Sequence, residues 1–147
     1  RVNTLTGRAF HCFLFALETA MRAGEIAALR WPDIDLDIRV ARLHHTKNGH
    51  PRHAPLSSKA VRLLQGLPEL DPVFGLSTDQ ISSLFRKIKD RAGIVGLTFH
   101  DSRHSAITRL SRKLDVLALA RMVGHKDLRQ LNTYYNETAA DLAKRLD

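Results

Sequence analysis

Residues 34–56 read IDLDIRVARLHHTKNGHPRHAPL, and this stretch decides the fold because its pattern differs from that of the rest of the chain. From Ile34 to Leu43 apolar residues largely alternate with polar ones, which is the pattern of a half-buried strand. Asn48-Gly49 follows, and this dipeptide is a strong signal of a hairpin turn because both central positions need positive φ. We therefore predict a small antiparallel sheet over residues 34–56 with its turn near Asn48.

The residues on both sides of this sheet predict helices. Phe10, Phe13, Leu14 and Leu17, for example, form an apolar stripe at helical spacing. The fold class is therefore mainly α with a small antiparallel β-sheet (α+β). The expected helices cover residues 5–20, 24–29, 57–65, 80–91, 98–113, 116–122, 127–135 and 138–146, with caps from Ser57-Ser58, from Ser77-Thr78-Asp79 and from Thr98, and a loop over Gly66–Leu76.

The composition narrows the class of protein. The chain has 147 residues, which fits a single domain over residues 1–147, and its 44% hydrophobic content is that of an ordinary globular protein. The longest apolar run, Cys12–Leu17, is far shorter than the roughly 20 residues that span a bilayer. The single cysteine excludes an internal disulfide framework and a cysteine-rich zinc site, and it favours a reducing, intracellular compartment.

The positive charge is the unusual feature. The chain carries 23 Lys and Arg against 15 Asp and Glu, a formal net charge of +8, which suggests a polyanionic partner such as nucleic acid. Ile38–Pro68 holds no acidic residue, and Arg86–Lys113 holds eight Lys or Arg against two Asp. Such runs fit either solvated faces or two walls of an anion-binding cleft.

Two polar residues stand out at a helix end and in the predicted turn. Arg22 follows the first predicted helix and, by itself, fits a surface arginine that pairs with Glu25 three residues later. Lys47 lies at the tip of the predicted hairpin, where it fits either a solubilising turn lysine or a proton donor that reaches into a groove. Spacing alone leaves both alternatives open for each residue.

A histidine and an arginine share one face of a predicted helix. His100 and Arg103 are three residues apart at its start, and a helix N-terminus with these side chains is a good phosphate site. His100 and His104 also have the spacing of a zinc pair, but the glutamate of the metalloprotease pattern is absent and no third ligand is signalled. Downstream, Tyr134 and Tyr135 point about 100° apart on a helix, so at most one of them faces a given site.

Taken together, these residues resemble the catalytic domain of tyrosine recombinases, the phage integrase family. No single motif is specific, but the order and spacing of four motifs match across nearly the whole chain. The four motifs are TAMRAGEIAALRW over residues 19–31, Thr46-Lys47-Asn48-Gly49 continuing to Arg52 and Pro55-Leu56, His100-Asp101-Ser102-Arg103, and Val123-Gly124-His125. The resemblance places the nucleophile nine residues after His125, at Tyr134.

The resemblance implies the integrase catalytic-domain fold and a reaction. A tyrosine hydroxyl attacks a DNA phosphodiester, leaving a 3′-phosphotyrosyl enzyme and a free 5′-hydroxyl, and a hydroxyl from another strand reverses the step. Arg22 and Arg103 would grip the phosphate in place of a metal ion, and Lys47 would protonate the leaving oxygen. No metal and no other cofactor is expected.

The remaining residues would support this centre. His100 is the candidate to accept or orient the proton of Tyr134, whose unperturbed pKa is near 10, and His125 would donate a hydrogen bond to the phosphate. Glu25 would hold Arg22 or an adjacent loop. Contacts to other phosphates of the duplex are expected from Arg39, Arg42, Arg52 and Arg86.

The family also implies partners and a location. We expect double-stranded DNA and a tetrameric synapse of identical chains, joined through the C-terminal segment 138–146, in a bacterial or phage-infected cytoplasm without a membrane partner. The family's N-terminal DNA-clamping domain is not in this chain. A phage or mobile-element integrase and a Xer-type recombinase both fit, and the alternatives outside the family are a non-catalytic DNA-binding module and a metal-dependent nuclease that uses His100 and His104.

Overall fold

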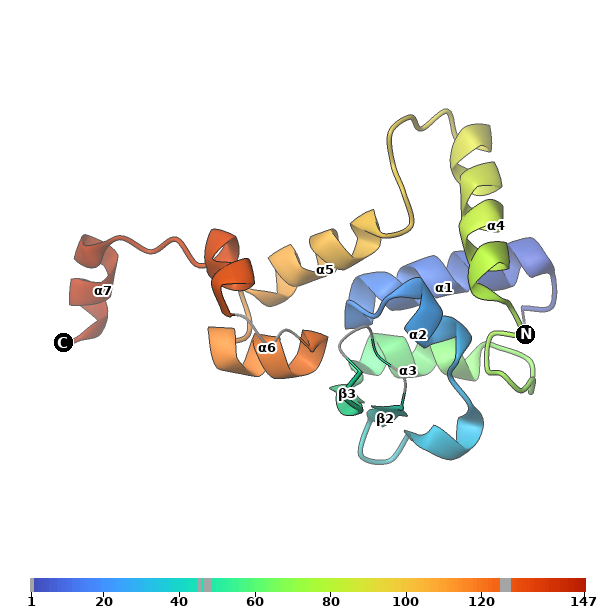
Figure 1. The fold of residues 1–147 in the computed structure, drawn as a ribbon, viewed down its shortest axis with the longest axis horizontal. Helices are drawn as coiled ribbons and strands as arrows, with labels where there is room; N and C mark the ends of the chain where they lie inside the picture. Colours follow the sequence, from blue (N-terminus) through green and yellow to red (C-terminus); the bar gives the residue numbers. More distant parts are fainter. Residues whose placement is uncertain (1, 45, 47–48, 125–127) are drawn as a thin grey trace.

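The computed structural model describes residues 2–44, 46, 49–124 and 128–147 (Figure 1). It confirms the predicted class, a mainly helical chain with one small antiparallel sheet. In chain order the elements are α1 (Leu5–Thr19), α2 (Ala23–Ala27), the 3-10 helix η1 (Trp31–Asp33), β1 (Ile34–Asp35), β2 (Val40–Leu43), β3 (Arg52–Pro55), α3 (Ser58–Gln65), α4 (Thr78–Arg91), α5 (Asp101–Leu110), α6 (Val116–Val123), the 3-10 helix η2 (Leu128–Tyr134) and α7 (Ala139–Arg145).

The sheet occupies the predicted stretch. Its order is β1-β2-β3, and the pairing of β2 with β3 sets Leu43 opposite Arg52 and Ala41 opposite Ala54. Beyond Leu43, the Gly49 N–H donates to the Thr46 carbonyl at 2.9 Å, and Gly49 has a φ of 75°. A positive φ of this size favours glycine and fits the predicted turn near Asn48, while Asn48 itself lies outside the described residues.

Short polar side chains fix where the helices begin. Ser57 accepts from the Ala60 N–H ahead of α3, and Ser77 accepts from the Gln80 N–H ahead of α4, as predicted from their positions. Gln80 completes a capping box by accepting from the Ser77 N–H at 2.9 Å.

The predicted cap at Thr98 is wrong. α5 begins three residues later than expected, at Asp101, and its N-cap residue is His100. The cause is a local turn, in which Asp101 Oδ2 accepts from the Thr98 N–H at 2.7 Å and the Asp101 N–H donates to the Thr98 carbonyl at 3.1 Å. The hydrogen bond from the Thr98 backbone also lowers the pKa of Asp101.

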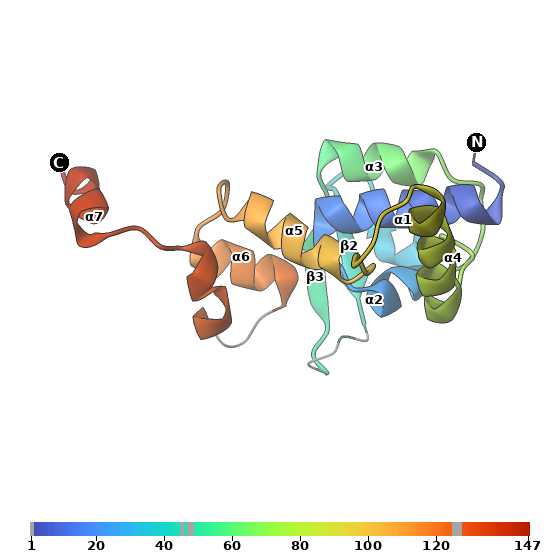
Figure 2. The ribbon, with the colours of Figure 1, turned by 90° about the horizontal axis from the view of Figure 1, so that it is seen from above.

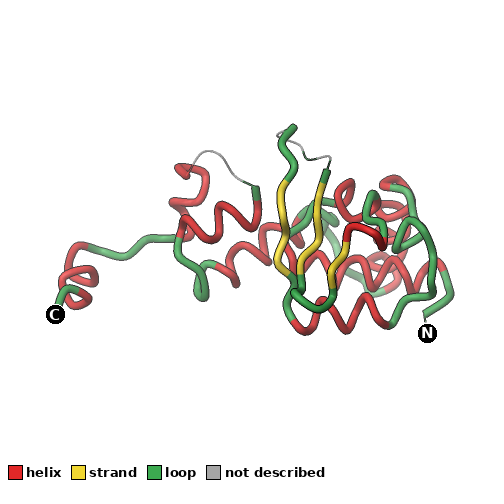
Figure 3. The backbone as a smooth tube through the Cα atoms, turned by 90° about the horizontal axis from the view of Figure 1, so that it is seen from below, coloured by secondary structure: helices red, strands yellow, loops and turns green. Residues whose placement is uncertain are grey.

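Two hydrophobic clusters form the core. The first lies among α1, α3, α4 and the sheet and includes Phe15 and Phe74, which are fully buried. The second lies among the end of α1, α5, α6 and η2 and includes Leu119 and Leu131. Figures 2 and 3 show the sheet between these two regions, with β3 facing α6. The seam between the clusters is where the candidate site lies.

The last helix stands apart from both clusters. η2 replaces the predicted α-helix over 127–135, and an extended segment then leads to α7, whose N-cap Thr138 accepts from the Asp141 N–H. No residue of α7 is buried, and Leu142 and Leu146 are exposed (Figures 1 and 2). Among the helices of the described ranges, none has both the length and the apolar character needed to cross a lipid bilayer.

Candidate active site

Arg103 lies at the seam between the two clusters. It is 4% exposed, and its guanidinium donates to the Ala20 carbonyl at 2.5 Å and to the Val123 carbonyl at 2.9 Å. These carbonyls end α1 and α6, where helix termini leave acceptors without intrahelical partners. One side chain therefore ties the ends of two helices and is held rigidly by them.

A buried carboxylate organises the other side of the seam. Glu25 Oε1 accepts from the Arg22 N–H at 2.9 Å, and its two oxygens accept from Arg52 Nη1 at 2.5 Å and Nη2 at 3.0 Å. Arg52 also donates from Nε to the Met122 carbonyl at 3.2 Å. Glu25 thus fixes the turn that carries Arg22 against strand β3, and the sequence did not predict its bidentate pair with Arg52.

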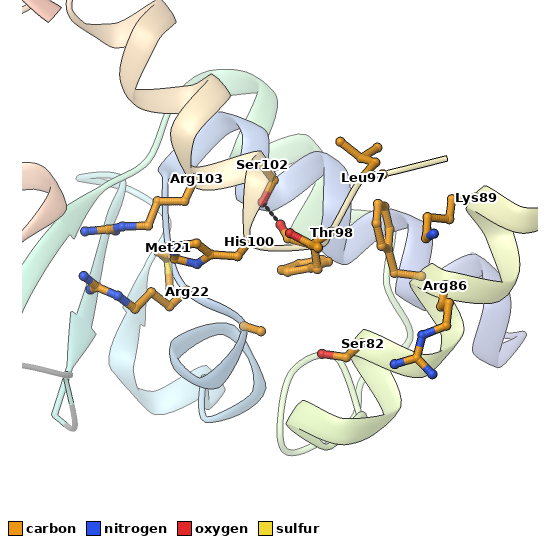
Figure 4. A pocket seen from close by; sticks show the side chains of 14 residues that line it. Met21, Arg22, Ser82, Arg86, Lys89, Leu97, Thr98, His100, Ser102 and Arg103 are labelled. Carbon is orange, nitrogen blue, oxygen red and sulfur yellow. Dashed lines mark hydrogen bonds between the residues drawn. The ribbon is translucent and has the colours of Figure 1, made fainter. Parts of the chain in front are cut away.

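Arg22 and Arg103 line one open pocket of about 430 Å³ between α2, α4 and α5. In Figure 4 they stand with His100 at one end of it, and Arg86 and Lys89 come from α4 at the other end. Arg22 Nε is buried and has no hydrogen-bond partner among the described residues. A buried donor beside a basic pocket fits an acceptor that an anionic ligand would supply.

The electrostatics of these residues favour an anion. Burial, together with the charges of Arg22 and Arg52, lowers the pKa of Arg103 to about 10, against the opposing charge of Glu25. Burial also lowers the pKa of Arg22; the negative charge of Glu25 acts against this shift, and the positive charge of Arg52 adds to it. The charge of Glu25 therefore acts on the guanidinium groups of Arg22 and Arg103 as well as on Arg52, which it binds directly. A phosphate bound here would relieve the repulsion among these guanidinium groups.

The two adjacent tyrosines have different partners. The Tyr135 hydroxyl donates to the Leu114 carbonyl at 2.6 Å, so it is used within the fold. The Tyr134 hydroxyl lies 2.6 Å from His104 Nδ1, and the charge of Arg103 acts on it. The family spacing already favoured Tyr134, and the structure distinguishes the two hydroxyls by their partners, a side chain for Tyr134 and a backbone carbonyl for Tyr135.

Several predicted residues lie elsewhere or outside the description. Lys47 and His125 are outside the described residues, and so is Asn48. Arg39, in the turn before β2, donates to Ser58 Oγ of α3 at 2.6 Å, and Arg42, on β2, donates to the Pro32 carbonyl at 3.2 Å; both residues are exposed.

Arg52 differs from the other proposed DNA contacts, because its side chain is only 10% exposed and already paired with Glu25. Its phosphate contact stays a prediction, while the structure gives it a positioning role. Within the part of the chain that the structure describes, no group of three or more His, Cys, Asp or Glu side chains is arranged to hold a metal ion.

The phage integrase family model matches residues 3–71 and 72–141, which is nearly the whole chain. The chain belongs to the phage integrase family. A putative integrase/recombinase of Haemophilus influenzae is 48% identical over 151 residues, covering 97% of this chain and 39% of the relative. The shufflon-specific DNA recombinase of Escherichia coli is 42% identical over 139 residues, covering 92% of this chain and 36% of the relative.

Solved structures agree on the fold of this integrase-family chain. The Tn1549 transposon integrase, in complex with transposon right end DNA, superposes with a TM-score of 0.78 at 15% identity, over 95% of this chain and 58% of that one. The XerH recombinase bound to its difH substrate gives a TM-score of 0.71 at 19% identity, over 100% of this chain and 49% of that one. The chain has the tyrosine recombinase catalytic-domain fold. It spans less than half of the length of the two curated relatives described above.

Proposed function

We propose that this integrase-family chain is the catalytic part of a site-specific DNA recombinase that cuts and rejoins double-stranded DNA through a 3′-phosphotyrosyl intermediate. The observation that carries the proposal is that Arg22 and Arg103 line one pocket and that the charge of Arg103 also acts on the hydroxyl of Tyr134. Similarity to the DNA-bound transposon integrase and XerH structures supports the choice of DNA as substrate.

The two arginines supply the charge that the reaction needs. Attack on a phosphodiester gathers negative charge on the two non-bridging oxygens, and guanidinium groups bind such oxygens bidentately. Arg103 already has two donors fixed on backbone carbonyls, so its remaining N–H groups are pre-oriented. Arg22, whose Nε is buried and unpartnered among the described residues, gains an acceptor when phosphate binds. In this proposal the arginines provide the stabilisation that other phosphoryl-transfer enzymes obtain from Mg²⁺.

Tyr134 is the proposed nucleophile. Its hydroxyl contacts the side chain of His104, whereas the Tyr135 hydroxyl donates to the Leu114 backbone carbonyl. Lys47 is proposed to protonate the leaving 5′-oxygen and His125 to donate to the scissile phosphate, both on the family motifs that they match. His100, which lines the pocket with the arginines, would orient the reacting phosphate.

Positioning of the duplex would fall to exposed basic residues. Arg39, Arg42 and Arg86 are all exposed, and Arg86 also lines the pocket from α4. Contacts of this kind set the register on DNA without reading its sequence, and the binding constant should fall steeply with salt.

Assembly is proposed to use α7. The helix has no buried residue, it is set apart from the body, and it exposes Leu142 and Leu146. A short amphipathic helix that buries nothing in its own chain fits the surface of a neighbouring copy, which agrees with a tetrameric synapse on DNA. A cytoplasmic, DNA-associated location follows from the same proposal.

The decisive test is a covalent protein–DNA adduct on nicked duplexes with a randomised core, in which the short fragment bearing the 5′-hydroxyl diffuses away after cleavage. We expect an adduct that survives denaturing electrophoresis and forms equally in EDTA. Tyr134→Phe should abolish it, and the matched control Tyr135→Phe should retain it.

The opposite results have distinct meanings. An adduct lost only in Tyr135→Phe would refute the choice of nucleophile. Binding of DNA without any adduct by the wild type would favour a non-catalytic DNA-binding module, and cleavage that EDTA abolishes would favour a metal-dependent nuclease.

A further inference from the structure

The hydroxyl of Tyr134 contacts one histidine of α5. Its Oη lies 2.6 Å from His104 Nδ1, and the two rings are 5.4 Å apart between centroids at 55°. We propose that His104 accepts the proton of the Tyr134 hydroxyl while that oxygen attacks the DNA phosphate. This inference rests on the proposed function and assigns a catalytic residue that the sequence motifs did not single out.

The direction of the hydrogen bond follows from the chemistry of the two groups. A phenol is a better hydrogen-bond donor than a neutral imidazole N–H, and an imidazole nitrogen is a better acceptor than a phenol oxygen. The favoured arrangement is therefore Oη–H donating to Nδ1, which puts the ring proton of His104 on Nε2. His104 is exposed, so the positive charge that the ring gains with the proton would be solvated.

The register of α5 delivers two chemical groups to the site from adjacent positions. Arg103 turns inward and is fixed on the Ala20 and Val123 carbonyls, while His104, one residue and about 100° further around the helix, is exposed and meets η2. The sequence favoured His100, four residues earlier, as the acceptor. The structure places the hydroxyl of Tyr134 on His104, and His100 among the residues that line the pocket.

An acceptor is needed because the phenol is not pre-ionised. Burial raises the pKa of Tyr134, and the charge of Arg103 only opposes this rise. The hydroxyl thus carries its proton near neutral pH, and attack on phosphorus requires that the proton leave at the same time.

The step is balanced. The Oη–H bond breaks and an Nδ1–H bond forms on His104, while the Oη–P bond forms and the bond from phosphorus to the 5′-oxygen breaks. The 5′-oxygen takes a proton from the general acid, proposed as Lys47. Rejoining reverses each change, because the imidazolium of His104 returns its proton to Oη as a 5′-hydroxyl attacks. No oxidant, reductant or other reactant is needed.

The hydrogen bond itself is tested without DNA or catalysis. In the chain labelled with ¹⁵N-histidine, long-range ¹H–¹⁵N NMR should show His104 with an unprotonated Nδ1 and a proton on Nε2. Tyr134→Phe should shift the Nδ1 signal, and the matched control Tyr135→Phe should leave it unchanged. A proton on Nδ1, or no response to Tyr134→Phe, would overturn the assignment.

The proton transfer is tested by single-turnover cleavage with two variants. His104→Ala removes the contact, whereas His104→Asn keeps an acceptor oxygen near the position of Nδ1 but cannot take a proton. Both should lower the cleavage rate by roughly 10²–10⁴-fold, the usual contribution of general acid–base catalysis. Unchanged thermal unfolding midpoints would exclude misfolding as the cause.

A substrate with sulfur in place of the bridging 5′-oxygen separates the two proton transfers, because a thiolate leaves without a proton. The loss in Lys47→Ala should largely disappear on this substrate, and the loss in His104→Ala should persist. A His104→Asn variant that cleaves at the wild-type rate, or a His104→Ala variant that cleaves as fast or faster, would overturn the inference while leaving the proposed function intact. A wild type that forms no adduct would overturn the proposed function, and the proton transfer with it, whatever the NMR shows.

Discussion

The buried carboxylate of Glu25 offers a sharp perturbation of the seam. Its side chain is 4% exposed and that of Arg52 is 10% exposed, and the carboxylate accepts from Arg52 at 2.5 and 3.0 Å and from the Arg22 N–H at 2.9 Å. Glu25→Gln keeps the shape of the side chain but replaces one acceptor oxygen by an NH₂ group. That group faces a guanidinium donor, and the negative charge among the three arginines is lost.

The size of the effect follows from this geometry. At least one charge-assisted hydrogen bond is lost, and a bond of this kind contributes about 1.5–3 kcal/mol. Arg52 is also left as a buried charge without its counterion. Removing one partner of a buried ion pair costs about 3–5 kcal/mol. We expect Glu25→Gln to lower the free energy of unfolding by about that amount, which corresponds to a fall in melting temperature on the order of 10 °C for a domain of this size.

The assay is urea unfolding followed by circular dichroism, with two controls. Glu137→Gln breaks the exposed pair with Arg145, whose side chains are 46% and 67% exposed, and should cost far less. Arg52→Met added to Glu25→Gln should recover part of the loss, because the uncompensated charge is gone. A loss below about 1 kcal/mol for Glu25→Gln, or strictly additive effects in the double variant, would refute the reasoning.

Three further predictions follow from other contacts. Gly124 has a φ of 76°, and a Cβ there would lie 2.9 Å from Arg52 Nη1, so Gly124→Ala should lower the free energy of unfolding by more than the roughly 1–2 kcal/mol that the left-handed backbone alone costs. The matched control in urea unfolding is Gly93→Ala, at φ 73° with nothing within 4 Å of its Cβ, and equal losses in the two variants would count against the clash. The hydrogen bond from the Thr98 backbone lowers the pKa of Asp101, so the stability that the ionised carboxylate adds is present above the unfolded pKa of 3.8 and disappears as the pH falls through the lower folded value. The melting temperatures of the wild type and Asp101→Asn should therefore differ at pH 7 and converge in strong acid. A difference that persists in strong acid would contradict the assignment. A truncation that removes α7, which has no buried residue, should leave the melting temperature unchanged but lower the fraction of DNA found in multi-protomer complexes by electrophoretic mobility shift, and a large fall in melting temperature would show that α7 packs in cis.

Local signals in the sequence predicted the elements that local chemistry determines. Ser57 and Ser77 are caps because a serine oxygen satisfies a backbone donor two or three residues on, and Gly49 marks the turn because of its φ. Thr98 failed as a cap because the Asp101 N–H donates to the Thr98 carbonyl and the Asp101 carboxylate accepts from the Thr98 N–H, which forms a separate turn ahead of α5. Side-chain to backbone hydrogen bonds of this kind compete with a helix start, and the sequence alone does not rank them.

The candidate site was predictable as a set of residues but not as a set of contacts. The spacing of the motifs placed Arg22, Arg103 and Tyr134 in one site, because family spacing encodes which residues converge. The pairing of Arg52 with Glu25 and the contact of His104 with Tyr134 join residues 27 and 30 positions apart, and no periodicity reports such contacts. The position of His104 directly after Arg103 was the one available signal.

The two backbone carbonyls that hold Arg103 have a consequence for when the enzyme is competent. One of them ends α1, which packs mainly in the first cluster, and the other ends α6 in the second cluster, so the guanidinium takes its position only after α1, α5 and α6 have come together. A chain folded in one half, during synthesis or after partial unfolding, lacks the second carbonyl and also lacks the helix that carries Tyr134. Under the proposed function, the capacity to break a DNA strand is thereby conditional on completion of the fold, and an incompletely folded copy bound to DNA would have no assembled centre with which to cut it.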